Sequence, residues 1–204
     1  MGPDYSREIK FNCIVAGVDE VGRGPWAGPV VAGAVILNPQ KIPYGLNDSK
    51  KLLAKHRQDL NIEIKSSSIW SIGVASVEEI DNINILQASL LAMRRAIKNL
   101  YPPPEACLVD GNKDPNFDIP TKCVIKGDCK SFSIAAASII AKVFRDNYMT
   151  KLSHSFPEYG WEKNAGYGVP QHIEALRVVG ISPHHRKSFK PISKILSEDS
   201  NITY

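Results

Sequence analysis

Acidic residues follow three separate apolar segments of this sequence, a pattern that can gather carboxylates at one place. The segments cover residues 14–18, 106–109 and 122–125, and the acids that follow them are Asp19, Glu20, Asp110 and Asp128. Continuous apolar runs of this length are typical of strands covered on both faces. In α/β sheets, strand ends and their loops converge on one edge, where binding sites form. We therefore expect the four carboxylates to lie close together.

Four neighbouring carboxylates predict a metal site. They could not all stay ionised without a cation, because each raises the pKa of its neighbours. Oxygen ligands without histidine or cysteine favour Mg²⁺ or Mn²⁺ over Zn²⁺. Two such ions about 3.5–4 Å apart can stabilise the attacking and leaving oxygens of a displacement at phosphorus. The pattern indicates phosphodiester hydrolysis by water, and the absence of a G-x-x-x-x-G-K-[ST] motif excludes a P-loop phosphotransferase.

Each acid also has a structural explanation that needs no function. An Asp-Glu pair at the end of a strand is often a solvated edge, and Asp110 can begin a turn with Gly111. Asp128 can lie ahead of a helix N-terminus, where carboxylates are favoured. Singly, each of these explanations is the simpler one. Repetition of the feature on three predicted strands of one sheet is what favours a shared site.

Composition places the chain among soluble globular proteins. Its 204 residues suffice for one well-buried domain, with 43% hydrophobic and 23% charged residues. No apolar run approaches the ~20 residues that cross a bilayer, and the N-terminus lacks a signal-peptide core, so we expect a cytoplasmic protein without a membrane partner. The four cysteines form no C-x-x-C pair, which favours reduced thiols. The net charge of +4 permits a nucleic-acid partner without indicating one.

The elements that position the acids are predicted to form one mixed α/β sheet layered with helices. The expected strands cover residues 14–18, 30–37, 68–76, 106–109 and 122–125. The first two are joined by a short loop and most economically pair as an antiparallel hairpin. The third alternates polar and apolar residues, as a half-buried strand does.

Capping residues predict where the main helices begin. The expected caps are Asp48 or Ser49 for the first helix, Ser76 with Glu79 as a capping box for the second, and Ser131 or Ser133 for the third. The second helix is long, Asn82 and Asn84 could break it in two, and a run of three prolines at 102–104 forbids its continuation. The first half of the third helix is apolar or small all round, so it should be buried.

Four motifs of the sequence resemble those of the ribonuclease HII family and occur in the same order. They are Asp19-Glu20-Val-Gly-Arg-Gly, Val109-Asp110-Gly, Lys126-Gly127-Asp128 with the alanine-rich segment that runs to Asp146, and Gly166-Tyr167-Gly168. The resemblance covers residues 14–189, and its first and third motifs are long and specific. It implies a ribonuclease H-like fold, with a mixed five-stranded sheet flanked by helices and a helical C-terminal region.

The resemblance implies an endonuclease that cuts RNA in RNA–DNA hybrids and at single ribonucleotides embedded in duplex DNA. It implies that the four acids bind Mn²⁺ or Mg²⁺ and are catalytic. It implies that Gly22, Arg23 and Gly24 read the 2′-hydroxyl through backbone groups and that Tyr167 packs on the sugar. Glycines let the main chain approach a sugar closely, and the 2′-hydroxyl separates RNA from DNA.

Two basic side chains near these motifs have open roles. Arg23 can pair with Glu20, although its flanking glycines favour a role facing the ligand. Lys50 can contact a phosphate or be a solvated lysine at a helix start. We expect no obligatory protein partner and a monomer.

The sequence also suggests how the chain is divided. We expect a flexible arm at 1–11, a catalytic core at 12–150, a helical substrate-binding region at 151–196 packed on the core, and a polar tail at 197–204. The last third is rich in lysine, arginine and histidine, and residues 192–196 are expected to form a short helix. Its basic run at 184–190 contains an aromatic residue. Such a run is usually a solvated face, but it can bind a phosphate backbone.

Two alternative functions share the predicted fold. One is a nuclease that acts on DNA junctions or in transposition, and the Gly-Arg-Gly loop speaks against it. The other is a hybrid-binding module without catalytic activity. Because all four acids are present, the sequence favours the nuclease over this module.

Overall fold

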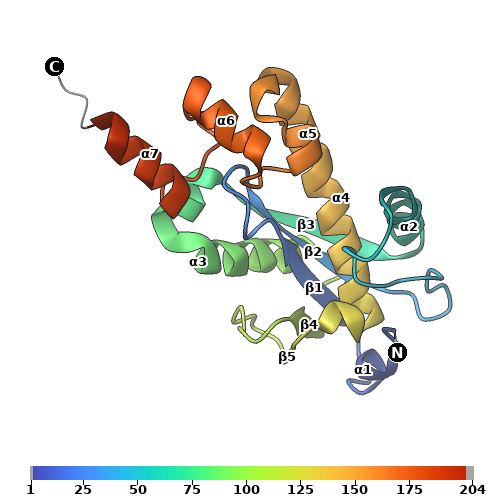
Figure 1. The fold of residues 1–204 in the computed structure, drawn as a ribbon. Coiled ribbons are helices and arrows are strands. Elements are labelled where there is room, and N and C mark those ends of the chain that lie inside the picture. The colour runs from blue at the N-terminus through green and yellow to red at the C-terminus, as the bar shows by residue number, and fades with distance from the viewer. Residues whose placement is uncertain (1, 201–204) are drawn as a thin grey trace.

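The computed structural model describes the backbone of residues 2–200 and the side chains of residues 2–197. A central sheet carries a helix on each face, and further helices extend from one end of it (Figure 1). The mixed five-stranded sheet flanked by helices is therefore confirmed. None of the helices in the described part of the chain combines the length and the apolar character that crossing a membrane needs.

The sheet has the strand order β3-β2-β1-β4-β5. Its strands are β1 (Val15–Val21), β2 (Val30–Ile36), β3 (Ile69–Ala75), β4 (Ala106–Asp110) and β5 (Thr121–Val124). The pairs β1–β2 and β2–β3 are antiparallel, so the predicted hairpin is confirmed. The pairs β1–β4 and β4–β5 are parallel. Parallel pairing brings the C-terminal ends of β1, β4 and β5 to the same edge.

The helices account for most of the remaining chain. They are α1 (Ser6–Ile9), α2 (Ala54–Ser67), α3 (Val77–Lys98), α4 (Phe132–Ser155), α5 (Trp161–Asn164), α6 (Pro170–Val178) and α7 (Lys190–Ser200), with short 3-10 helices η1 (Gly127–Cys129) and η2 (Pro157–Tyr159). Helix α3 covers one face of the sheet, α4 crosses the other, and α2 lies beside α4 (Figure 1).

Helix α4 lies directly on β1, because Gly17 leaves no side chain between them. A Cβ added at Gly17 would overlap the backbone of Ser133 in the first turn of α4. On the opposite face, Ala16 and Val18 pack in the cluster that includes the buried side of α3. Small residues on β1 thus let two helices approach the strand that carries the first two acids.

Two of the predicted helix starts are confirmed. Ser76 accepts a hydrogen bond from the Glu79 backbone and Glu79 reaches back to the Ser76 backbone, which completes the capping box of α3. Ser131 caps α4 by accepting from the Ile134 backbone N–H. Within α3, Asn84 has φ 64° and kinks the helix, as its position in the sequence suggested.

The predicted cap of the first long helix is wrong. Helix α2 begins at Ala54, and Leu53 precedes it without a side-chain capping bond. Asp48 instead accepts from the Lys50 backbone at 2.9 Å within a turn. The Ser49 hydroxyl bonds the Ser138 hydroxyl on α4 at 2.8 Å. Because both polar side chains have other partners, they do not start the helix.

The C-terminal region forms a cluster of its own beyond the sheet. Its buried residues include Met149 at the end of α4, Trp161 on α5, Leu176 on α6 and Ile192 on α7. The helix expected at 192–196 is longer than predicted, because α7 begins at Lys190 and continues to Ser200. The remainder of the expected polar tail, residues 201–204, lies outside the described residues.

The N-terminal segment differs from the loose arm that was expected. Helix α1 places Glu8 against the start of α4, where its side chain is buried. One Glu8 oxygen accepts hydrogen bonds from the Ser131 hydroxyl, the Ser133 hydroxyl and the Ser133 backbone N–H at 2.6–3.0 Å. A carboxylate is favoured at a helix N-terminus, where unpaired N–H groups point outward. These contacts hold the arm to the core.

We predict that Glu8→Ala lowers the free energy of unfolding by about 1.5–3 kcal/mol, because it removes three hydrogen bonds to a charged acceptor and leaves their buried donors unpaired. Chemical denaturation of the variant measures this loss. Lys10→Ala, at an exposed position of the same segment, is the control and should change stability by less than about 0.5 kcal/mol. Equal stability of the two variants would show that the segment is not anchored.

Candidate active site

The four predicted acids converge at one edge of the sheet. Asp19 and Glu20 lie near the end of β1, and Asp110 is the last residue of β4. The register pairs Val18 with Val109, so Asp19 and Asp110 are the next residues on neighbouring parallel strands. Asp128 reaches the same place from η1, which follows β5. All four line one cavity of about 200 Å³.

Burial and mutual repulsion disfavour the ionised forms of these acids. Asp19 is only 6% exposed, and burial followed by the nearby Glu20 and Asp110 carboxylates holds its pKa well above the ordinary value. Burial also raises the pKa of Glu20, and Arg23 opposes that shift. The pKa of Asp128 is raised by burial and then by Asp48 and Asp110. A cation in the cavity would remove this cost.

Hydrogen bonds orient two of the acids. Asp110 Oδ1 accepts from the Gly127 backbone N–H at 2.6 Å, so it ties the end of β4 to the turn that carries Asp128. Asp19 Oδ1 accepts from the Glu20 backbone N–H at 2.7 Å. The nearby Ser138 side chain opposes the rise of the pKa of Asp19. Carboxylates fixed in this way need little reorganisation to receive a ligand.

Basic side chains complete the cavity. Lys50 lines it, as does Lys142, which the sequence analysis did not single out. Lys142 is held by Asp146 at 2.7 Å, and the same carboxylate lies 3.8 Å from Arg57. Residues 138, 142 and 146 recur at four-residue spacing on α4, so they share one face of the helix. That spacing is the signal by which Ser138 and Lys142 could have been found.

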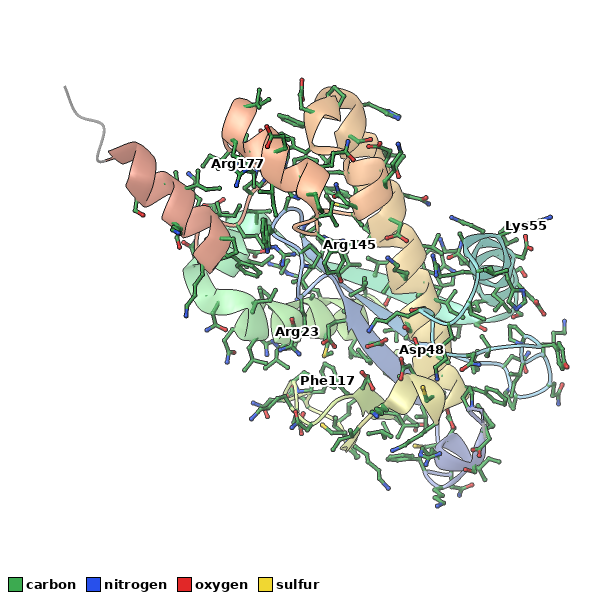
Figure 2. The ribbon with its side chains drawn as sticks, viewed as in Figure 1. Arg23, Asp48, Lys55, Phe117, Arg145 and Arg177 are labelled. Atoms are coloured by element: carbon green, nitrogen blue, oxygen red, sulfur yellow. The ribbon has the colours of Figure 1, made fainter. Side chains whose placement is uncertain are left out.

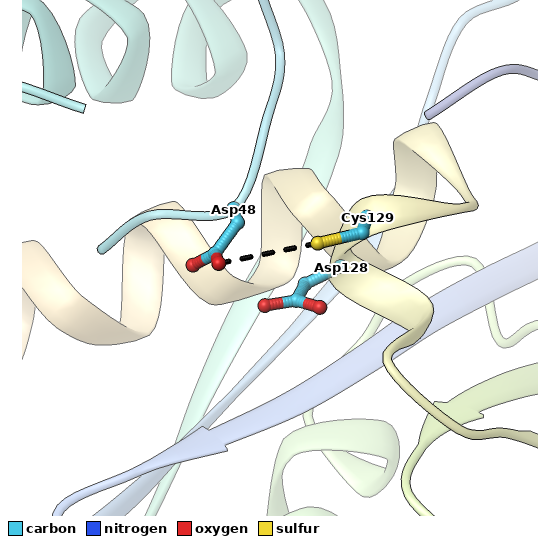
Figure 3. Close-up of side chains that lie close together, drawn as sticks. All are labelled: Asp48, Asp128 and Cys129. Carbon is cyan, nitrogen blue, oxygen red and sulfur yellow. Dashed lines mark hydrogen bonds between the residues drawn. The ribbon is translucent and has the colours of Figure 1, made fainter. Parts of the chain in front are cut away.

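Asp48 extends the acidic cluster beyond the predicted four (Figure 3). Asp48, Asp128 and Cys129 offer ligand atoms that all lie within 4.8 Å of one another. The Cys129 thiol lies 3.9 Å from Asp48 Oδ2 and 3.3 Å from the Lys51 ammonium group. All four cysteines are free, as expected, but Cys129 lies beside the acids rather than in an apolar core, and Cys13 is exposed. Asp48 was not identified as a site residue because it follows no predicted strand and was instead assigned as a possible helix cap.

Gly22 and Gly24, which were expected to contact the ribose, lie in the loop that follows β1. Gly22 has φ +95°, a backbone conformation that side chains with a Cβ rarely adopt. A Cβ added at Gly24 would lie 3.3 Å from the Tyr167 ring, so this ring packs beside the loop. Arg23 does pair with Glu20, at 3.2 Å, and its side chain remains 50% exposed. Tyr167 is 47% exposed and lines the same cavity as the acids.

Arg186 is fully buried and donates hydrogen bonds to the backbone of this loop. Its Nη2 donates to the carbonyl oxygens of Gly22 at 2.6 Å and Pro29 at 3.2 Å. Its Nη1 donates to Arg23 at 3.0 Å, and its Nε donates to Gly28 at 2.9 Å. Burial lowers the pKa of Arg186 to about 9, so the side chain stays cationic at neutral pH. The planar guanidinium thus fixes both ends of the loop.

Arg145 on α4 supports the same loop from a second direction (Figure 2). It donates to the carbonyl oxygens of Pro29 at 3.0 Å, Ala27 at 3.0 Å and Ala165 at 2.9 Å. The last bond connects the loop to the turn that leads to Tyr167. Burial lowers the pKa of Arg145 to about 10, which leaves it charged at neutral pH. Neither buried arginine was identified as functional from the sequence.

The basic run at 184–190 is not a solvated face. His185 and Arg186 are fully buried within the C-terminal region, whereas Lys187 and Lys190 remain exposed. Arg186 is buried because it donates to carbonyl oxygens of the loop after β1, and His185 packs against the Tyr159 ring. Buried arginine needs such partners, and a basic run in a sequence does not reveal whether they exist.

Two histidines connect this run to Tyr167. The Ser182 backbone N–H donates to His185 Nδ1 at 2.9 Å, so that nitrogen carries no proton. His185 Nε2 lies 2.9 Å from His172 Nε2, and His172 Nδ1 lies 2.9 Å from the Tyr167 carbonyl oxygen. Neutral His185 therefore carries its proton on Nε2 and donates it to His172 Nε2. His172 then carries its own proton on Nδ1 and donates it to the Tyr167 carbonyl oxygen. The neutral pair fixes the backbone of Tyr167.

We predict that this pair makes the protein less stable in acid. Burial lowers the pKa of His185 to about 4 in the folded protein, against an ordinary value of 6.5. As the pH falls, His185 is protonated near pH 6.5 in the unfolded chain but only near pH 4 in the folded protein. The contribution of neutral His185 to the free energy of unfolding is therefore complete above pH 6.5, and about 2–3 kcal/mol of it is lost as the pH falls towards 4. The free energy of unfolding measured between these pH values should fall more steeply for wild type than for His185→Asn.

The control for this prediction is His56→Asn, at an exposed histidine, which should keep the wild-type slope. The raised pKa values of Asp19, Glu20 and Asp128 act with the opposite sign and are common to all three proteins. Identical slopes for the two variants would contradict the role of His185.

Known proteins have sequences and structures similar to those of this chain. The profile of the ribonuclease HII family matches residues 16–192. A ribonuclease HII of Jannaschia sp. (strain CCS1) is 54% identical over 96% of this chain and 99% of its own length. The ribonuclease H2 of Pyrococcus horikoshii OT3 superposes with a TM-score of 0.78 at 28% identity, covering 93% of this chain and 99% of that chain.

A third relative was solved with a protein partner. The Archaeoglobus fulgidus structure is a PCNA:RNase HII complex, and it superposes with a TM-score of 0.69 at 27% identity over 87% of this chain and 95% of that chain. The family profile covers most of the chain, and the Jannaschia relative matches it over nearly the full length of both proteins. The chain therefore belongs to the ribonuclease HII family, the endoribonucleases that hydrolyse the RNA strand of RNA–DNA hybrids.

Proposed function

We propose that Asp19, Glu20, Asp110 and Asp128 bind divalent metal ions and form the catalytic centre for cleavage of the RNA strand. The observation that carries this proposal is their convergence from three strand ends on one cavity. The raised pKa of Asp19 supports it, because neighbouring carboxylates cause part of that rise and a bound cation would reverse it. Oxygen donors of this kind suit Mg²⁺ or Mn²⁺.

The residues around the acids have separate tasks in the proposed reaction. Divalent ions bound there would activate the attacking water and stabilise the charge that develops on the leaving oxygen. Lys142, held in place by Asp146, and Lys50 bring positive charge to the cavity where a phosphate would lie. Ser138 of α4 lines the same cavity as Asp19. Positioning and charge stabilisation of this kind supply most of the rate in phosphoryl chemistry.

We propose that Gly22, Arg23 and Gly24 recognise the ribose at the cut site and allow cleavage at single ribonucleotides in duplex DNA. The Gly22 and Arg23 carbonyl oxygens are held by Arg186, so the orientation of these peptide groups is set before a ligand arrives. Tyr167 packs beside Gly24 and leaves about half of its ring exposed for a sugar. A fixed backbone beside an open ring suits recognition of a 2′-hydroxyl.

The proposed division of labour follows the order of the chain. The four acids come from the expected catalytic core at 12–150, and Tyr167 comes from the helical region at 151–196. Arg186 joins the two by bonding the loop after β1. We infer that the C-terminal region binds substrate and completes recognition.

We also propose that the isolated chain acts as a cytoplasmic monomer without an obligatory protein partner. All the groups described above belong to one chain. The A. fulgidus relative in complex with PCNA shows that a protein of this family can bind a partner. With no added protein, activity should rise in proportion to enzyme concentration, as expected for a monomer that needs no partner.

We predict that Asp110→Asn abolishes cleavage and leaves substrate binding intact. Asparagine keeps an oxygen that accepts from the Gly127 N–H but loses the charge that holds a cation. With a labelled duplex that contains one ribonucleotide, kcat should fall at least about 100-fold, and the Kd should stay within a few fold. Chelation should remove wild-type activity, and Mg²⁺ or Mn²⁺ should restore it.

The matched control is Asp114→Asn, which changes an exposed acid four residues further on. An all-DNA duplex and a continuous RNA–DNA hybrid complete the assay and separate this activity from a nuclease for DNA. Added metal should raise the Tm of the wild type more than that of Asp110→Asn. Equal cleavage by the two variants, or cleavage by metal-free enzyme, would refute the assignment.

We predict that Arg186→Lys misplaces the recognition loop. Lysine keeps the charge but cannot donate to four carbonyl oxygens in one plane. We expect kcat/KM on the single-ribonucleotide duplex to fall at least about 10-fold, and the free energy of unfolding to fall by about 2–4 kcal/mol. Arg177→Lys, at an exposed arginine of α6, should match wild type in both measurements. A wild-type kcat/KM for Arg186→Lys would contradict the role of this loop.

A further inference from the structure

A second, smaller cavity adjoins the four acids on the side of α3. It has a volume of about 120 Å³ and shares Glu20 and Asp110 with the larger cavity. This is the room of about four water molecules. Lys50 and Tyr167 line only the larger cavity, whereas Lys113 lines only the smaller one. The two acids therefore stand between two neighbouring cavities.

The walls of the smaller cavity combine positive charge with an apolar surface. Arg23 and Lys113 supply the charge, from the loops after β1 and β4 respectively (Arg23 is labelled in Figure 2). Leu86, Leu90 and Met93 of α3 form the apolar side. A negatively charged group with an apolar body, such as the phosphate and sugar of a nucleotide, matches both kinds of wall.

The cationic groups are available to a ligand. Lys113 is exposed and forms no ion pair with any residue that the structure describes. Arg23 pairs with Glu20 through Nη1, and half of its side chain remains exposed. Asn112 is exposed beside Lys113 and adds a polar amide to the rim. Lys113 thus lines the same cavity as Glu20 and Asp110 without an ion pair that would account for its position.

We propose that this cavity binds the phosphodiester next to the one being cut, on the same strand, with Lys113 as its main cationic ligand. The inference rests on the proposed catalytic role of the four acids. If the scissile phosphate lies at Glu20 and Asp110, the strand continues from Tyr167 in one cavity to Lys113 in the other. The subsite would hold the cut strand in register while the loop at Gly22–Gly24 reads the ribose.

Steady-state kinetics of Lys113→Ala on the single-ribonucleotide duplex test the subsite. We expect KM to rise about 3–10-fold with kcat unchanged within two-fold, and the slope of log(kcat/KM) against log[salt] to become less steep by about 0.9, the value for one lost phosphate contact. Lys113→Arg should restore KM. Lys122→Ala, which removes an exposed lysine of β5 that lines neither cavity, should behave as wild type.

Neutral linkages in the substrate identify the phosphate concerned. Duplexes that carry one methylphosphonate, placed at each position on either side of the ribonucleotide, are cut by wild type and by Lys113→Ala. At one position adjacent to the scissile phosphate, the neutral linkage should raise the wild-type KM and have no further effect on Lys113→Ala. The proposal is wrong if the effects of the neutral linkage and of Lys113→Ala on KM add at every position. It is also wrong if Lys113→Ala and Lys122→Ala have equal KM values.

These outcomes are distinct from a failure of the proposed function. If the metal assignment is wrong, wild type cuts without metal or Asp110→Asn remains active, whatever Lys113 does. If only the subsite is wrong, wild type is metal-dependent and Lys113→Ala has wild-type kinetics. Thermal unfolding of each lysine variant confirms that it is folded, and both positions are exposed, so a Tm within about 2 °C of wild type is expected.

Discussion

Electrostatic repulsion among the four carboxylates is the constraint on which the rest of the structure depends. The parallel pairing of β1 and β4 places Asp19 beside Asp110, and the turn after β5 adds Asp128. Such a cluster is costly in a folded protein unless cations compensate it. Arg23 supplies part of that compensation from the loop, because it pairs with Glu20 and lowers its pKa. In the function proposed above, bound metal ions would supply the remainder, because a cation reverses the repulsion among the carboxylates.

Two buried arginines fix the conformation of the glycine-containing loop after β1. The loop after β1 contains Gly22 at a positive φ, and on its own it would adopt many conformations. Arg186 and Arg145 fix its carbonyl oxygens from the C-terminal region and from α4. Burial of the two charges is offset because their donors find acceptors in the loop. The site thus combines acids fixed by strand pairing with a loop fixed by side chains distant in sequence.

The sequence by itself determined the features that depend on neighbouring residues. Apolar runs ending in acids gave the strand ends and the candidate metal ligands, and the capping box of Ser76 and Glu79 gave the start of α3. Asn84 indicated the kink in that helix, because asparagine tolerates a positive φ. The predictions of the strand ends, the capping box and the kink succeeded because strand burial and helix capping act over one to four residues. The family resemblance supplied the roles expected of Tyr167 and the glycine loop, which spacing alone did not indicate.

Only the tertiary structure decided what the charged residues far from the strand ends do. Glu8 looked like part of a loose arm, yet it binds the start of α4, 123 residues away from Ser131. Arg186 looked solvated, yet it is buried against carbonyl oxygens more than 150 residues earlier. Asp48 lies beside Asp128 and Cys129 rather than at a helix N-terminus. A charged side chain is exposed or buried according to whether distant partners satisfy it, and no local pattern in the sequence records those partners.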